Sequence, residues 1–204
     1  MGRAGVGVDN VAMDDATRLG IAIINAPAGN TIAVAELFFG GVLSLLRHLP
    51  RADMSMHSGR WERSDLTGTE MKGKTLGIVG LGRIGGEIAN RAHAFGMQML
   101  AYDPYISKDR FRALRATATE SLEALLPEVD VLTVHTPLND ETRGMIGPDE
   151  LALLRDGAIV VNMARGGIIR DDALVTELES GRLRGAVLDV FSQEPLTGDH
   201  PYRT

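Results

Sequence analysis

The sequence contains no cysteine, few aromatic residues and no excess of positive charge. None of its 204 residues is Cys, and only 4% are Phe, Trp or Tyr. Without cysteine, disulfides, cysteine-ligated metal sites and a cysteine nucleophile are excluded. With 21 basic and 27 acidic residues the net charge is −6, and no basic patch is visible. The sequence therefore does not favour a nucleic-acid partner, and we assign no metal-ligating residues.

Long hydrophobic runs are also lacking. The longest apolar segment, residues 32–46, carries Glu36 and two glycines and is short for a membrane span, so we expect a buried helix. The N-terminal apolar stretch is interrupted by Asp9 and Asn10, unlike a signal peptide. The composition, 44% hydrophobic and 24% charged, is ordinary for a soluble globular chain. We expect a cytoplasmic protein with no membrane partner.

Short β-rich runs alternate with helical patterns along most of the chain, which predicts an α/β fold of the Rossmann type, a doubly wound parallel sheet. The expected strands are residues 21–24, 75–79, 97–102, 131–134, 158–161 and 186–190. The expected helices are residues 31–48, 84–95, 122–126, 148–155 and 172–179, with a shorter helix ending near residue 59.

The strongest local signal is the stretch TLGIVGLGRIGG, which contains a G-x-G-x-x-G motif. The motif directly follows a β run and opens a helix, the context of a dinucleotide-binding turn. The first glycine permits the tight turn, the second lets a pyrophosphate approach the backbone, and the third lets the helix lie close to the strand. Free N–H groups at the helix start would attract the phosphates. The expected phosphate-binding residues are Gly80, Gly82, Arg83, Ile84 and Gly85.

An acidic residue ends the strand after the glycine motif. Asp103, followed by Pro104, can accept hydrogen bonds from the two hydroxyls of an adenosine ribose. The negative charge of Asp103 would repel a 2′-phosphate, so we expect NAD rather than NADP. The alternative is an ordinary turn aspartate before a proline.

Several motifs occur in one order: GRAGVGVDNV, NAPAGNTIAVAEL, GTEMKGKTLGIVGLGRIGGEIA, VHTPLNDETRGMI, VNMARGG and AVLDVFSQEP. In that order they resemble the D-isomer-specific 2-hydroxyacid dehydrogenases. The resemblance implies two α/β domains with the catalytic cleft between them. Residues 1–28 resemble only the last piece of the N-terminal substrate domain, and residues 29–204 resemble the NAD-binding domain. We therefore expect a cofactor domain with a remnant of the substrate domain attached.

The resemblance implies hydride transfer between NAD and a small D-2-hydroxy or 2-keto acid. Arg165, in the loop after the strand 158–161, can grip a carboxylate or keto oxygen through two parallel hydrogen bonds. On sequence alone it could equally be a surface arginine in a glycine-rich loop. Glu194 matches the acid that orients and charges the family's active-site histidine. Arg165 and Glu194 are thus the expected catalytic residues.

Further site residues follow from the resemblance alone. Asp189 is expected to bind the nicotinamide carboxamide. The remaining residues expected to line the cofactor are His135, Thr136, Pro137, Met163, Ala164 and Arg165. For His135, a purely structural role stays open. The expected substrate contacts are Val6, Gly7, Asn30 and Arg165.

The family's acid/base histidine lies in a Pro-His motif that would come after the last residue of this chain. His200 resembles a residue of the preceding loop, so we do not expect it to be catalytic. The chain alone is then expected to bind NAD without turnover. The alternative is a non-enzymatic NAD(H)-binding regulatory module, like the related dinucleotide-binding corepressors.

The expected helix 31–48 is apolar almost all round, so it must be covered on more than one side. The resembling family dimerises through its nucleotide domain. We therefore expect a homodimer, and burial within one chain is the alternative.

Overall fold

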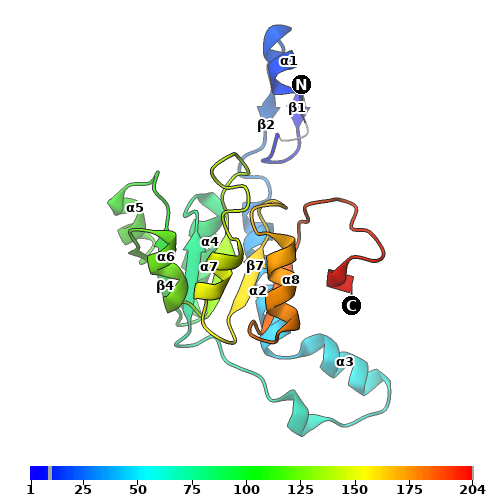
Figure 1. The fold of residues 1–204 in the computed structure, drawn as a ribbon. Coiled ribbons are helices and arrows are strands. Elements are labelled where there is room, and N and C mark those ends of the chain that lie inside the picture. Colours follow the sequence, from blue (N-terminus) through cyan, green and yellow to red (C-terminus); the bar gives the residue numbers. More distant parts are fainter. Residues whose placement is uncertain (9–10, 204) are drawn as a thin grey trace.

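The computed structural model describes residues 1–8 and 11–203. These residues form a small N-terminal unit that stands away from a larger α/β body (Figure 1). In the N-terminal unit two short parallel strands pair beside one helix: β1 (Gly2–Arg3), α1 (Met13–Arg18) and β2 (Ile24–Asn25). The strand expected at 21–24 is wrong in extent, since only its last residue belongs to β2.

In the described part of the chain, the body contains one six-stranded sheet in the order β5-β4-β3-β6-β7-β8, and every neighbouring pair is parallel. The strands are β3 (Thr75–Val79), β4 (Gln98–Tyr102), β5 (Thr117–Ala118), β6 (Val131–Val134), β7 (Ile159–Asn162) and β8 (Gly185–Leu188). Because the strands are parallel, their carboxyl ends share one edge, where open α/β sheets bind ligands.

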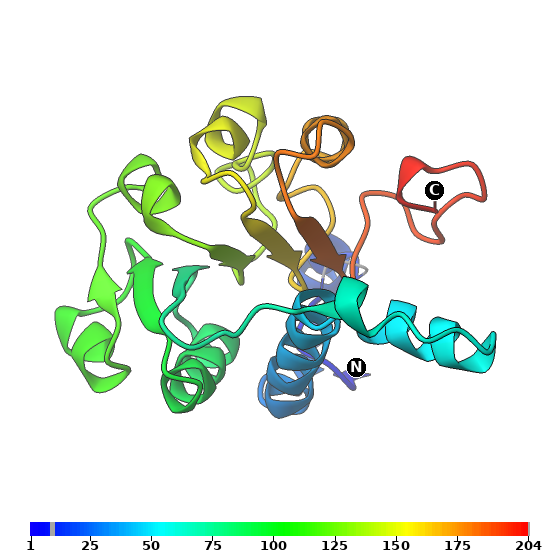
Figure 2. The same ribbon diagram turned by 90° about the horizontal axis from the view of Figure 1, so that it is seen from below.

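Helices cover both faces of this sheet (Figure 2). One face carries α2 (Thr31–Leu46), α4 (Arg83–Ala94) and α5 (Lys108–Ala113). The other carries α6 (Leu122–Leu125), η2 (Leu126–Glu128), α7 (Pro148–Leu153) and α8 (Asp171–Glu179). All residues of β6 and β7 are buried, as expected for central strands covered on both sides. The predicted doubly wound α/β fold is confirmed.

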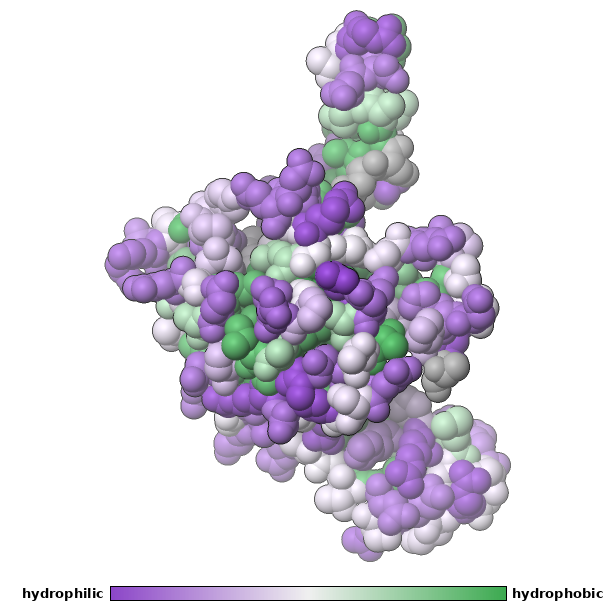
Figure 3. Space-filling model, viewed as in Figure 1, coloured by the Kyte–Doolittle hydropathy of each residue, from purple (hydrophilic) through white to green (hydrophobic). Residues whose placement is uncertain are grey.

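Beyond α2 the chain forms an arm that leaves the body. The arm consists of α3 (Leu49–His57) and the short helix η1 (Arg63–Leu66). In the space-filling view this arm and the N-terminal unit project on opposite sides of the body (Figure 3). No single helix of the described residues is long and apolar enough to cross a membrane; α2 and α3 pass that test only as a pair, bent by 61°.

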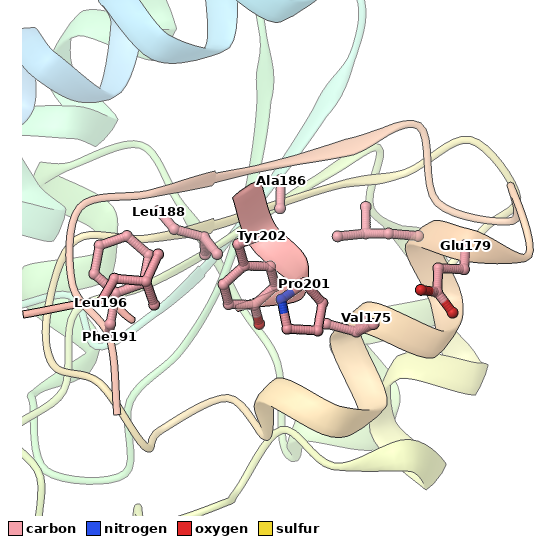
Figure 4. Close-up of a pocket in the computed structure, with 9 residues that line it drawn as sticks. Val175, Glu179, Ala186, Leu188, Phe191, Leu196, Pro201 and Tyr202 are labelled. Atoms are coloured by element: carbon pink, nitrogen blue, oxygen red, sulfur yellow. The ribbon is translucent and has the colours of Figure 1, made fainter. Parts of the chain in front are cut away.

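The edge strand β8 borders an apolar groove of about 470 Å³ (Figure 4). The groove lies between α8, β8 and the C-terminal segment with its short helix η3 (Pro201–Arg203). Its lining residues are Val175, Leu178, Glu179, Ala186, Leu188, Phe191, Leu196, Pro201 and Tyr202. Glu179 is the only charged side chain among these lining residues, so none of them offers a positive charge to a pyrophosphate.

Candidate cofactor-binding site

The glycine motif begins at the carboxyl end of β3, between β4 and β6. The Gly80 N–H donates to the Tyr102 carbonyl at 2.9 Å, and the His135 N–H donates to the Val79 carbonyl at 2.7 Å. Gly80 has φ +92°, a conformation that favours glycine, and a Cβ there would lie 2.9 Å from the His135 carbonyl. The first glycine is therefore required by the fold itself.

The other two glycines of the motif have different surroundings. A Cβ on Gly85 would lie 2.3 Å from the carbonyl oxygen of Gly80, so α4 can approach β3 this closely only with glycine there. A Cβ on Gly82 would meet nothing within 4 Å, and Gly82 is exposed at the start of α4. No described residue lies where a Gly82 side chain would, which fits a ligand lying against the backbone.

Asp103 is held over the glycine loop. One carboxylate oxygen accepts a hydrogen bond from the Leu81 N–H at 2.9 Å, and the other accepts one from the Tyr105 N–H at 3.0 Å. An ionised carboxylate has about four acceptor positions, so capacity for two ribose hydroxyls remains. This geometry leaves the Asp103 carboxylate, just after β4, with positions that can accept hydrogen bonds from a ribose.

Two polar atoms beside the glycine loop are orphaned. His135 Nδ1 and Thr136 Oγ1 are shielded from solvent and have no hydrogen-bond partner among the described residues. His135 Nε2 pairs with the Thr133 hydroxyl at 2.8 Å, and burial lowers the pKa of His135 to about 3. Shielded polar atoms without partners are costly, so the polar groups of a dinucleotide fit this position.

The loop after β7 is braced by a residue that the sequence did not single out. The buried side chain of Asn162 donates to the Arg165 carbonyl at 2.8 Å and accepts from the Ala164 N–H at 3.1 Å. Met163 and Ala164 are buried, and the Arg165 guanidinium donates to the Ala164 carbonyl at 2.6 Å. Asn162 thus shapes the loop that presents Arg165.

The Arg165 loop lies against the turn that carries Glu194. A Cβ on Gly166 would lie 1.9 Å from the Phe191 carbonyl oxygen, so the two backbones are in contact. Glu194 is exposed, and one of its carboxylate oxygens accepts a hydrogen bond from the Phe191 N–H at 3.0 Å. The two expected catalytic residues therefore lie on adjoining segments at the carboxyl end of the sheet.

The other expected residues around this edge lie as follows. Asp189 directly follows β8 with its side chain exposed, and its N–H donates to the Asn162 carbonyl at 3.0 Å. His200 Nδ1 accepts from the Tyr202 N–H at 3.3 Å within the C-terminal segment. That position agrees with the expectation of a loop residue.

The expected substrate residues belong to the N-terminal unit and its junction. The Val6 carbonyl accepts from the Asn25 side chain at 2.8 Å, and the Gly7 carbonyl accepts from Arg3 Nε at 3.1 Å. Asn30 is exposed just before α2. These bonds shape the loop whose N–H groups are expected to meet a carboxylate.

Arg83, the first residue of α4, links the glycine loop by a hydrogen bond to the segment that joins the N-terminal unit to the body. Its guanidinium donates to the Pro27 carbonyl at 3.4 Å, so this side chain turns toward the N-terminal unit. Its expected contact with the phosphates would require that bond to be exchanged. Arg110 of α5 donates to the Gly82 carbonyl at 3.1 Å. The sequence offered no signal for Arg110, because the helix that carries it was not predicted.

Comparison with known proteins agrees with this geometry. Residues 39–204 match the family model described as D-isomer specific 2-hydroxyacid dehydrogenase, NAD binding domain. D-3-phosphoglycerate dehydrogenase of Bacillus subtilis is 48% identical over 98% of this chain and 39% of the relative. The human protein of that name is 48% identical over 96% of this chain and 36% of its own length. The chain thus spans about two fifths of the length of these curated relatives.

Solved structures show the same fold. A D-lactate dehydrogenase from Aquifex aeolicus, solved with NAD and lactic acid, has a TM-score of 0.88 and 31% identity, covering 99% of this chain and 63% of that one. A Granulicella formate dehydrogenase has a TM-score of 0.94 and 29% identity, covering 100% and 55% respectively. The chain belongs to the D-isomer-specific 2-hydroxyacid dehydrogenases, and its α/β body is their NAD-binding domain.

Proposed function

We propose that this chain supplies the cofactor-binding part of an NAD-dependent dehydrogenase that acts on D-3-phosphoglycerate. The observation that carries the proposal is the 45–48% identity to relatives bearing that enzyme's name over nearly the whole chain. The open backbone at Gly82 and the held carboxylate of Asp103 support NAD as the cofactor.

The chemistry requires a hydride acceptor, a grip on the substrate and a proton acceptor. NAD, when bound, supplies the hydride acceptor for the substrate C2–H. The amides around Gly82 hold the pyrophosphate, Asp103 accepts the ribose hydroxyls, and Asp189 accepts from the carboxamide. His135, Thr136, Pro137, Met163 and Ala164 line the remainder of the cofactor site.

We assign the substrate to residues on both sides of the cleft. Arg165 binds the carboxylate or the carbonyl oxygen and remains charged throughout. The backbone at Val6 and Gly7, together with Asn30, completes the grip from the N-terminal side. Glu194 positions and charges the histidine that takes the hydroxyl proton. The proton acceptor itself is not among the residues we assign.

We further propose that the chain alone binds NAD(H) without turning over. The imidazole of His135, whose pKa desolvation lowers to about 3, is too weak a base to take a hydroxyl proton near neutral pH. His200 is hydrogen-bonded within its own segment. The Glu194 carboxylate accepts a hydrogen bond from the Phe191 N–H.

The assignment is tested by assaying the full-length protein with D-3-phosphoglycerate and NAD and following NADH formation. We expect steady turnover, and we expect Arg165→Ala to reduce it strongly. NAD binding without NADH formation from any D-2-hydroxy acid would instead support a non-enzymatic regulatory module.

We also propose a homodimer that buries the α3 arm. The arm leaves the body and exposes large apolar side chains. Those side chains are Leu49, Met54, Met56 and Trp61. Exposed apolar surface on a projecting element is typical of an association surface.

A further inference from the structure

Two loops from opposite sides of β3 are joined by a side-chain hydrogen bond. One follows β4 and carries Tyr105; the other follows β6 and carries Glu141. The Tyr105 hydroxyl donates to a Glu141 carboxylate oxygen at 2.5 Å. Because β4 and β6 both neighbour β3, their backbones lie two strand spacings apart, about 10 Å. This hydrogen bond therefore joins loops that start on either side of β3, at whose carboxyl end the glycine loop begins.

Both partners are positioned by the backbone around them. The Tyr105 N–H is held by the carboxylate of Asp103, the expected ribose-binding acid, at 3.0 Å. The Glu141 N–H is held by the Asn139 side chain at 3.0 Å, which also accepts from the Thr142 N–H at 3.0 Å. The contact thus joins two turns whose shapes are fixed independently.

We propose that Tyr105 and Glu141 form a clasp over the adenosine end of the bound cofactor, in which the Tyr105 ring covers the adenosine and Glu141 disfavours a 2′-phosphate. The proposal rests on the proposed function of NAD binding at Gly82 and Asp103. The Tyr105 side chain is 80% exposed, so the protein itself does not bury the ring. An aromatic ring beside a nucleotide site offers a face on which a base can stack.

The charges around Tyr105 support the proposal that Glu141 disfavours a 2′-phosphate. The hydrogen bond to Glu141 raises the pKa of the Tyr105 hydroxyl, and the charges of Glu141 and Asp103 act in the same direction. Both carboxylates are therefore close enough to influence one hydroxyl. Two negative charges at this point would repel a ribose 2′-phosphate, so Glu141 adds to the selectivity expected from Asp103.

The clasp is tested by titrating NADH and NADPH into the chain and three variants. Tyr105→Ala removes the ring, Glu141→Gln removes the charge but keeps an oxygen acceptor, and Asp140→Asn removes a neighbouring exposed charge of the same loop as the matched control. All three positions are exposed, so circular dichroism should show unchanged folding.

We expect Tyr105→Ala to weaken NADH binding about fivefold to tenfold, the lower range for loss of one base–aromatic stack. Glu141→Gln should raise NADPH affinity relative to NADH about threefold, the size of one exposed charge interaction. Asp140→Asn should leave both affinities within twofold. If the unaltered chain binds NADH but Tyr105→Ala binds it equally well, or Glu141→Gln matches Asp140→Asn, the clasp is wrong. No NADH binding to the unaltered chain would overturn both the clasp and the proposed function.

Discussion

At the residue scale, the three glycines of one motif are needed for different physical reasons. Gly80 and Gly85 are required by the protein's own backbone, whereas Gly82 faces open space. A sequence motif cannot separate these cases, because spacing alone does not say whether a side chain would meet protein or ligand. The contrast between Gly82 and Gly85 gives the first prediction.

Gly85→Ala should destabilise the fold by about 1–3 kcal/mol, the usual cost of forcing atoms into a packed interior. Gly82→Ala should change the free energy of unfolding by less than about 0.5 kcal/mol and yet weaken NADH binding about tenfold or more. Urea unfolding measures the free energy of unfolding, and calorimetric titration measures the affinity for NADH. Equal stability losses in both variants would contradict the distinction.

His135 leads to a second prediction, on pH. Its pKa is about 3 in the folded chain and close to 6.5 when unfolded. Below pH 6.5 the unfolded chain takes up a proton that the folded chain refuses, so stability falls as the pH falls from about 6.5 toward 3.

We expect His135 to lower the free energy of unfolding by about 2 kcal/mol when the pH falls from 7 to 5. The His135→Gln variant has no imidazole to titrate, so its free energy of unfolding should fall less between pH 7 and pH 5, by about 2 kcal/mol. Urea unfolding of both proteins at pH 7 and at pH 5 measures this difference. An identical pH dependence in the variant would show that His135 does not carry the effect.

At the scale of elements, much of the sheet could be predicted from the sequence. The predicted strands 75–79 and 131–134 coincide with β3 and β6. Both are continuous apolar runs in the middle of a parallel sheet, where burial on two faces leaves a clear pattern. The patterns that carry most information are thus those of the central strands.

The short elements at the edge of the sheet and in the N-terminal unit were not predicted. The six-residue helices α1 and α5 and the two-residue strand β5 were not predicted, whereas α6 and α7, which are no longer than α1, were, so length alone is not the reason. β2 exists only because it pairs with β1, which lies more than twenty residues earlier. Such elements depend on tertiary contacts that no local pattern reports.

Adjacent glycines in α2 lead to a third prediction. A Cβ on Gly41 would lie 2.4 Å from Val187 Cγ1 of β8, whereas a Cβ on Gly40 would meet nothing within 4 Å. Gly40→Ala should stabilise the chain by about 0.5–1 kcal/mol, because alanine favours helix. Gly41→Ala should destabilise it by about 1–3 kcal/mol through the clash with β8. The same sign of change in both variants, measured by urea unfolding, would contradict this packing of α2 on β8.

At the scale of the whole molecule, the α3 arm decides the expected assembly. Met54 and Met56 are 62% and 59% exposed on the arm. Replacing both by Glu should shift the chain from dimer to monomer in light scattering at micromolar concentration, because charges would be buried in the interface. Leu153→Glu, at a 40% exposed residue of α7, is the control and should leave the mass unchanged. A monomeric unaltered chain would rule out the dimer.

The residues of the candidate site differ in how far along the sequence their hydrogen-bond partners lie. The glycine motif and Asp103 follow strands directly, so the sequence indicated them. Arg110 and the Tyr105–Glu141 pair act across loops or helices that only the folded chain brings together, whereas Asn162 ends β7 and bonds to residues two and three positions further along the chain. Sequence reasoning therefore indicated candidate residues in the turns that follow strands, and it gave no signal for Asn162, Arg110, Tyr105 or Glu141.

The central claim is that the carboxyl end of β3 is an NAD site, and calorimetric titration of the chain with NADH tests it most directly. We expect saturable binding of one NADH per chain, weaker binding of NADPH, and marked weakening of NADH binding in Gly82→Ala. Absence of saturable heat, or NADPH binding as tight as NADH binding, would contradict the account.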